Sequence, residues 1–74
     1  MVQVDELEAR LAAALPGATI AVVDTTGAGD HFEVRVRAAV FRDLSLVEQH
    51  RAVYDALGDL MPRVHALAIR TESA

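Results

Sequence analysis

The chain has 74 residues, of which 53% are apolar and 24% charged, and its formal net charge is −4. This composition predicts one small globular domain over residues 1–74 and argues against a general binder of polyanions, although all seven cations are arginine. The absence of cysteine excludes disulfides, a thiolate nucleophile and a zinc site made of cysteines. Since the sequence shows neither a membrane-length apolar run nor a signal-peptide pattern, we expect a cytoplasmic protein without a membrane anchor.

The N-terminal segment, residues 1–15, is predicted to form an amphipathic helix. Its carboxylates fall in the first turns, where the helix dipole favours negative charge. Pro16 followed by Gly17 ends the helix, because proline cannot continue the hydrogen-bond ladder and glycine accepts the chain reversal. The stripe expected to face the core consists of Val4, Leu7, Leu11 and Leu15.

Residues 19–25 and 31–38 predict a β-hairpin. The first segment is rich in β-branched residues and too short for an independent helix, and the second alternates strictly between apolar and polar positions. Helices should therefore cover one face of the hairpin and water the other. In the loop between the strands, Gly27 and Gly29 are expected to adopt positive φ angles.

A second helix is predicted to begin at Leu46, because Ser45 and Glu48 have the spacing of a capping box. Pro62 predicts the end of this helix. Phe41, in the connector before the helix, is expected to fill the edge of the core. The stripe expected to face the sheet comprises Leu46, Val53, Leu57, Leu60 and Met61, with Tyr54 beside it and polar residues such as Gln49 mostly outside it.

Residues 64–71 alternate again and predict a third strand. Periodicity alone leaves open whether the face with His65, Leu67 and Ile69 or the opposite face is the core. A strand, helix and strand within one layer imply a right-handed crossover, so the third strand should lie parallel to the second. The expected fold is a single α+β domain of order α-β-β-α-β, with both helices on one face of a three-stranded mixed sheet.

Histidines are the main candidates for function, because the residues needed for catalysis are scarce. Ser45 is committed to capping and Ser73 lies in the tail, so no catalytic triad is expected and we predict a protein that is not an enzyme. Parallel second and third strands would bring His31 and His65 together at one end of the sheet. Two imidazoles can bind iron, zinc or copper, but a second molecule must complete the coordination shell. His50, alone on the second helix, is expected to be structural.

Two segments carry a family pattern. The segment from Phe41 to Leu57 contains L-S-L and H-R-x-V-Y-x-x-L, and residues 65–71 read H-A-L-A-I-R-T. Residues 30–34 (DHFEV) look like the start of the corresponding second strand. In these features the chain resembles the BolA family almost from end to end. The resemblance implies a fold similar to the class II KH type, in agreement with the predicted order of elements.

The resemblance implies an adaptor in iron–sulfur cluster assembly, trafficking and iron homeostasis. Such proteins bridge a [2Fe-2S] cluster with a monothiol glutaredoxin and glutathione, so the cluster is not intrinsic to the isolated chain. His65 matches the ligand of the closing strand. The second ligand, a Cys or His in the loop between the first two strands, has no counterpart in residues 25–30, which leaves His31 as the substitute. The alternatives are a cluster held through His65 alone and a glutaredoxin contact that needs no cluster.

Two other functions stay open. The resemblance also implies a DNA-binding transcriptional regulator of stress response and cell morphology, for which Arg51, Arg63 and Arg70 are the candidate contacts. The negative net charge and the lack of a GXXG clamp argue against this alternative. The third is a small scaffold whose exposed strand edge pairs with a partner or with itself in a weak homodimer.

Overall fold

The computed structural model describes residues 2–74 and confirms the predicted fold class and order of elements. The predicted first helix also included Met1, which lies outside the described residues. In the part of the chain that is described, no helix is both long and apolar enough to cross a membrane. The elements are α1 (Val4–Ala14), β1 (Thr19–Asp24), β2 (His31–Ala38), the 3₁₀ helix η1 (Ala39–Asp43), α2 (Leu46–Leu57), the 3₁₀ helix η2 (Gly58–Arg63) and β3 (Ala66–Ser73).

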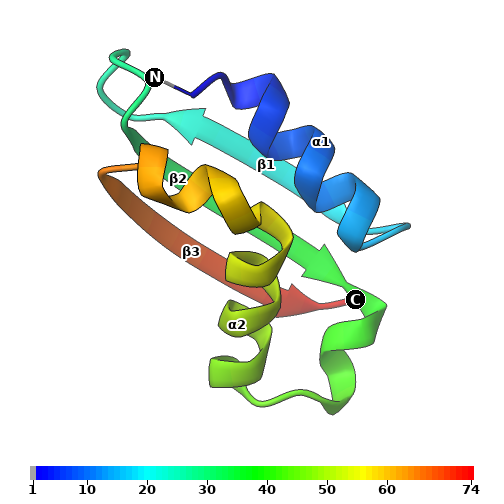
Figure 1. Ribbon diagram of the computed structural model, residues 1–74. Helices are drawn as coiled ribbons and strands as arrows, with labels where there is room; N and C mark the ends of the chain where they lie inside the picture. Colours follow the sequence, from blue (N-terminus) through cyan, green and yellow to red (C-terminus); the bar gives the residue numbers. More distant parts are fainter. Residues whose placement is uncertain (1) are drawn as a thin grey trace.

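The sheet has the order β1-β2-β3, and both helices lie on one of its faces (Figure 1). β1 pairs with β2 in the antiparallel sense, whereas β2 pairs with β3 in the parallel sense. The prediction that the third strand lies parallel to the second is therefore confirmed. In the parallel pair His31 lies opposite Ala66, so the two strands begin at the same end of the sheet.

The core lies between the sheet and the two helices. On β2 every second residue, from Phe32 to Ala38, is buried, as its alternating sequence predicts. On β3 it is Leu67 and Ile69 that face the helices. Phe41 is 1% exposed, which confirms that it fills the edge of the core. The buried residues are Val2, Leu7, Leu11, Val22, Phe32, Val34, Val36, Ala38, Phe41, Val53, Leu57 and Leu60.

The third strand begins at Ala66, two residues later than predicted. The N–H of Val64 still donates to the carbonyl of Met61 at 3.0 Å, so η2 occupies the backbone up to this point. His65 consequently lies in a bend before the strand and is exposed, although it has the same parity as the core-facing Leu67. The bend resolves the conflict between an apolar strand face and a histidine that burial would penalise.

The second helix begins where the capping box predicts. The N–H of Glu48 donates to Ser45 Oγ at 3.2 Å, and the N–H of Ser45 donates to Glu48 Oε1 at 2.9 Å. The predicted end at Pro62 is wrong, because the α-helix stops at Leu57. Gly58 has a φ of +46°, which takes the backbone out of the α region, and Pro62 lies within the following 3₁₀ helix.

Part of the predicted stripe on the second helix is also wrong, since Leu46 is 61% and Tyr54 is 44% exposed. The inward position in the first turns belongs to Gln49, which was expected outside the stripe. Its side-chain NH₂ group donates to the carbonyls of Phe41 at 3.2 Å and Leu44 at 3.0 Å. Its Oε1 accepts from the Thr71 hydroxyl at 2.6 Å, so this polar side chain joins the helix to β3 with its hydrogen bonds satisfied.

Replacing Ser45 by Ala should lower the free energy of unfolding by about 1 kcal/mol, because the first turn of α2 loses its side-chain acceptor. Urea denaturation followed by circular dichroism measures this difference. Ser45→Asp is the matched control, since it keeps an acceptor and should stay close to the wild-type stability. A Ser45→Ala variant as stable as wild type would show that the capping box does not stabilise the folded state.

Candidate functional site

The loop between β1 and β2 is shaped by the carboxylate of Asp24. Its Oδ1 accepts from the N–H groups of Thr26 at 3.3 Å and Gly27 at 2.8 Å, and its Oδ2 accepts from Gly29 at 2.9 Å. Gly27 and Gly29 have φ angles of +79° and +77°, as predicted. β1 ends at Asp24, one residue earlier than predicted, as this side chain turns toward the loop.

The structure brings His31 and His65 together at this end of the sheet. Their ring centroids are 4.9 Å apart and the ring planes are inclined by 59°. This juxtaposition was predicted from the parallel pairing, which puts His31 opposite Ala66 and hence beside His65. His31 is half-buried and His65 is exposed, so the pair is accessible to another molecule.

Asp30 contacts both histidines. Its carboxylate Oδ1 lies 2.8 Å from His31 Nδ1, and its main-chain carbonyl accepts from the N–H groups of His65 at 2.8 Å and Ala66 at 3.1 Å. The hydrogen bond from His31 holds the pKa of the Asp30 carboxyl below its usual range. An ionised carboxylate only accepts, so His31 donates from Nδ1, and in the neutral form of the ring Nε2 then carries the lone pair that can bind a metal.

The donor set fits one half of a metal or cluster site. Two imidazole nitrogens can ligate one iron of a [2Fe-2S] cluster, and a carboxylate bound to the other ring nitrogen is a common support for a ligating histidine. Two ligands leave a tetrahedral shell incomplete. Within residues 2–74 no group of three or more His, Cys, Asp or Glu side chains is placed to hold a metal ion.

The three arginines proposed as partner or nucleic-acid contacts do not form one surface. Arg51 is exposed on α2, and Arg63 at the end of η2 lies 3.7 Å from a carboxylate oxygen of Glu6. Arg70 projects from the opposite, helix-free face of the sheet and lies 3.7 Å from Glu33.

Asp30 was not among the site residues predicted from the sequence. The signal in the sequence was its place directly before a histidine, where the loop meets the strand. His50, expected to be structural, is half-buried on α2.

Comparison with known sequences places the chain in a family. The family described as "BolA: BolA-like protein" matches residues 10–74. The chain belongs to the BolA-like family. It is 33% identical over 73 residues to the uncharacterized protein RP812 of Rickettsia prowazekii (strain Madrid E), covering 97% of this chain and 95% of that protein. It is 38% identical over 71 residues to Protein BOLA2 of Arabidopsis thaliana, covering 95% of this chain and 76% of that protein.

Solved structures of BolA proteins share the fold of this BolA-like chain. The crystal structure of a bol-like protein from Babesia bovis matches with a TM-score of 0.88 at 26% identity, covering 99% of this chain and 86% of that one. The BolA domain of SufE1 from Arabidopsis thaliana matches with a TM-score of 0.83 at 26% identity, covering 99% of this chain and 95% of that one. The agreement extends over nearly the whole chain, including the segments that carry the two histidines.

Replacing His31 by Ala should raise the Asp30 pKa toward the ordinary aspartate range, because the lost hydrogen bond is the largest cause of the lowering. The folded-state pKa lies below the unfolded value of about 4, so the stabilisation is present above that pH and is lost as the pH falls through the folded value. A ¹³C NMR titration of the Asp30 carboxyl group measures the shift, with His50→Ala as the control. An unchanged Asp30 titration in His31→Ala would show that the 2.8 Å contact does not form in solution.

Proposed function

We propose that this BolA-like protein is a non-enzymatic adaptor in iron–sulfur cluster handling, which shares a [2Fe-2S] cluster with a monothiol glutaredoxin. The observation that supports the proposal is the adjacent pair of imidazoles at the end of the sheet, with centroids 4.9 Å apart. His65 also corresponds to the closing-strand ligand that the family resemblance implies. His31 supplies the second nitrogen where the loop has neither Cys nor His.

The residues around the pair have distinct roles in this proposal. The cluster, when bound, supplies an iron that accepts nitrogen ligands from this chain, while the glutaredoxin cysteine and glutathione hold the other side. His65 is the exposed ligand, so its ring is accessible to the partner. Asp30 fixes the ring of His31 through Nδ1 and presents Nε2, and its carbonyl anchors the backbone of His65.

Reconstitution with a monothiol glutaredoxin, iron, sulfide and glutathione tests the proposal. The wild-type chain should form a heterodimer whose cluster differs from that of the glutaredoxin alone in visible absorption and circular dichroism. His65→Ala should abolish this spectrum, and His31→Ala should weaken cluster retention, because each variant removes one nitrogen ligand. Size-exclusion chromatography reports the heterodimer separately from the spectrum.

His50→Ala is the matched control, because it removes the third imidazole without touching the pair, and its cluster spectrum should equal that of wild type. A spectrum and complex unaffected by His65→Ala would disprove the ligand role. Loss in His65→Ala with no effect of His31→Ala would reassign the site to His65 alone.

The three arginines proposed as DNA contacts do not support the DNA-binding alternative. Affinity for duplex DNA depends on cations that contact neighbouring phosphates. Arg51 and Arg70 project from opposite sides of the sheet, and Arg63 lies near Glu6. We therefore favour the iron–sulfur adaptor over the transcriptional regulator.

A further inference from the structure

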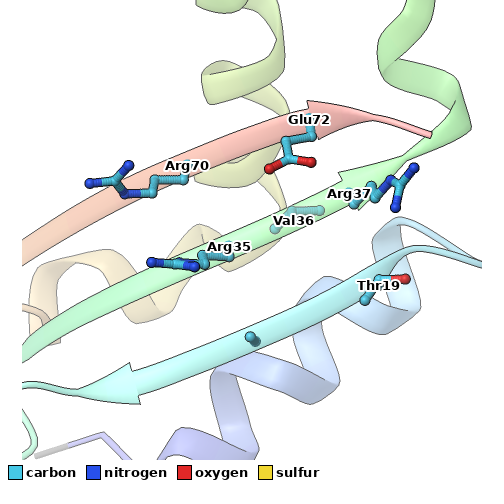
Figure 2. Close-up of a pocket in the computed structure, with 7 residues that line it drawn as sticks. Thr19, Arg35, Val36, Arg37, Arg70 and Glu72 are labelled. Carbon is cyan, nitrogen blue, oxygen red and sulfur yellow. The ribbon is translucent and has the colours of Figure 1, made fainter.

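The face of the sheet opposite the helices carries a hollow of about 310 Å³. It lies over the later part of β2 and the adjoining strands, whereas His31 is at the start of β2 (Figure 2). A volume of this size is at the lower end of the range of small-molecule sites, roughly 300–1,000 Å³. The hollow is lined by Thr19, Ala21, Arg35, Val36, Arg37, Arg70 and Glu72.

The charge of the hollow is opposite to that of the whole chain. Three of the seven arginines line it, against one carboxylate, in a protein with a net charge of −4. The strand register puts Arg35 directly opposite Arg70, and like charges in this position repel. Glu33 Oε1 lies 3.1 Å from Arg35 Nε and 3.7 Å from Arg70 Nε, so one carboxylate serves two guanidinium groups. An excess of positive charge remains at this end of the hollow.

The other end of the hollow has a cation of its own. Arg37 forms no hydrogen bond or ion pair with any residue of the described chain, residues 2–74, although its register partner on β3 is Glu72. Figure 2 shows Arg35 and Arg70 extending in one direction along the sheet and Arg37 in the other. On the β1 side the lining is low, because Ala21, which lies opposite Arg35, has only a methyl group. The hollow thus has guanidinium groups at both ends and little bulk on its β1 side.

We propose that this hollow binds a small organic molecule with an oxyanion group, carboxylate or phosphate, at each of its two ends. Guanidinium groups present paired donors that match the geometry of both kinds of oxyanion. Glu72 can accept from an N–H or O–H group of the same molecule. The site shares no residue with the histidine pair, so it stands whether or not the chain binds a cluster.

A titration of the ¹⁵N-labelled chain followed by NMR tests this site. Glutarate and pyrophosphate, each with two oxyanion groups, serve as the probes, and acetate and inorganic phosphate at matched ionic strength serve as their single-group controls. At least one probe should produce saturable shifts at Thr19, Ala21, Arg35 and Arg37, with an affinity about tenfold higher than its single-group control. The probe that binds more tightly identifies the ligand as a dicarboxylate or a bisphosphate.

Two variants distinguish binding in the hollow from a general effect of net charge on affinity. Arg37→Gln should weaken probe binding about tenfold, since one end of the ligand loses its partner. Arg51→Gln is the matched control, because it removes the same charge from α2 on the other side of the sheet and should change the affinity less than about twofold. Circular dichroism confirms that both variants fold.

Three results would overturn the proposal. The first is a set of shifts that grow linearly without saturating, or that map outside the hollow. The second is an equal loss of affinity in Arg37→Gln and Arg51→Gln, which would reflect net charge alone. The third is binding of duplex DNA to this face without binding of either probe, which would assign the arginines to a phosphate backbone.

Discussion

Parallel pairing of β2 with β3 is the interaction on which the rest of the structure depends. Parallel strands start at the same edge of a sheet, and the register places His31 opposite Ala66 at that edge. A shift of one residue would turn Leu67 and Ile69 away from the helices and would direct Arg70 toward the core. The hydrophobic core therefore determines the register, and the register determines how far apart the two imidazoles lie.

Hydrogen bonds in the loop between β1 and β2 also help to position the two histidines. The main-chain carbonyl of Asp30 binds the N–H groups of His65 and Ala66, while its side chain binds the ring of His31. The carboxylate of Asp24 holds the preceding turn through three backbone N–H groups. Two acidic residues thus orient two histidines, one through the shape of the loop and one by direct contact. Under the proposed function, this arrangement lets a short loop without a Cys or His of its own contribute to the metal-binding surface.

The sequence alone predicts most of the fold because its signals are local. The capping box at Ser45 and the alternation of β2 each involve neighbouring residues, and the crossover rule then orders the strands. The predictions fail where residues distant in the sequence determine whether a side chain is buried. Gln49 is polar and was placed outside the stripe, yet its amide finds acceptors and a donor in other elements. The proximity of His31 to His65 could be predicted from the strand topology. The contact between His31 and Asp30 could not, because it depends on the shape of the loop, which residue spacing does not encode.

The size of the chain explains why both candidate sites lie at the surface. Within residues 2–74 no polar or charged residue is fully buried, so the fully buried core is apolar. Exposed imidazole and guanidinium groups are well solvated, and their interactions strengthen when a second molecule excludes water. In the proposed function the histidine pair supplies two ligands of a larger shell, and in the further proposal the arginines hold a small molecule in a hollow that is open to solvent. Each proposed site therefore needs a second molecule to complete it.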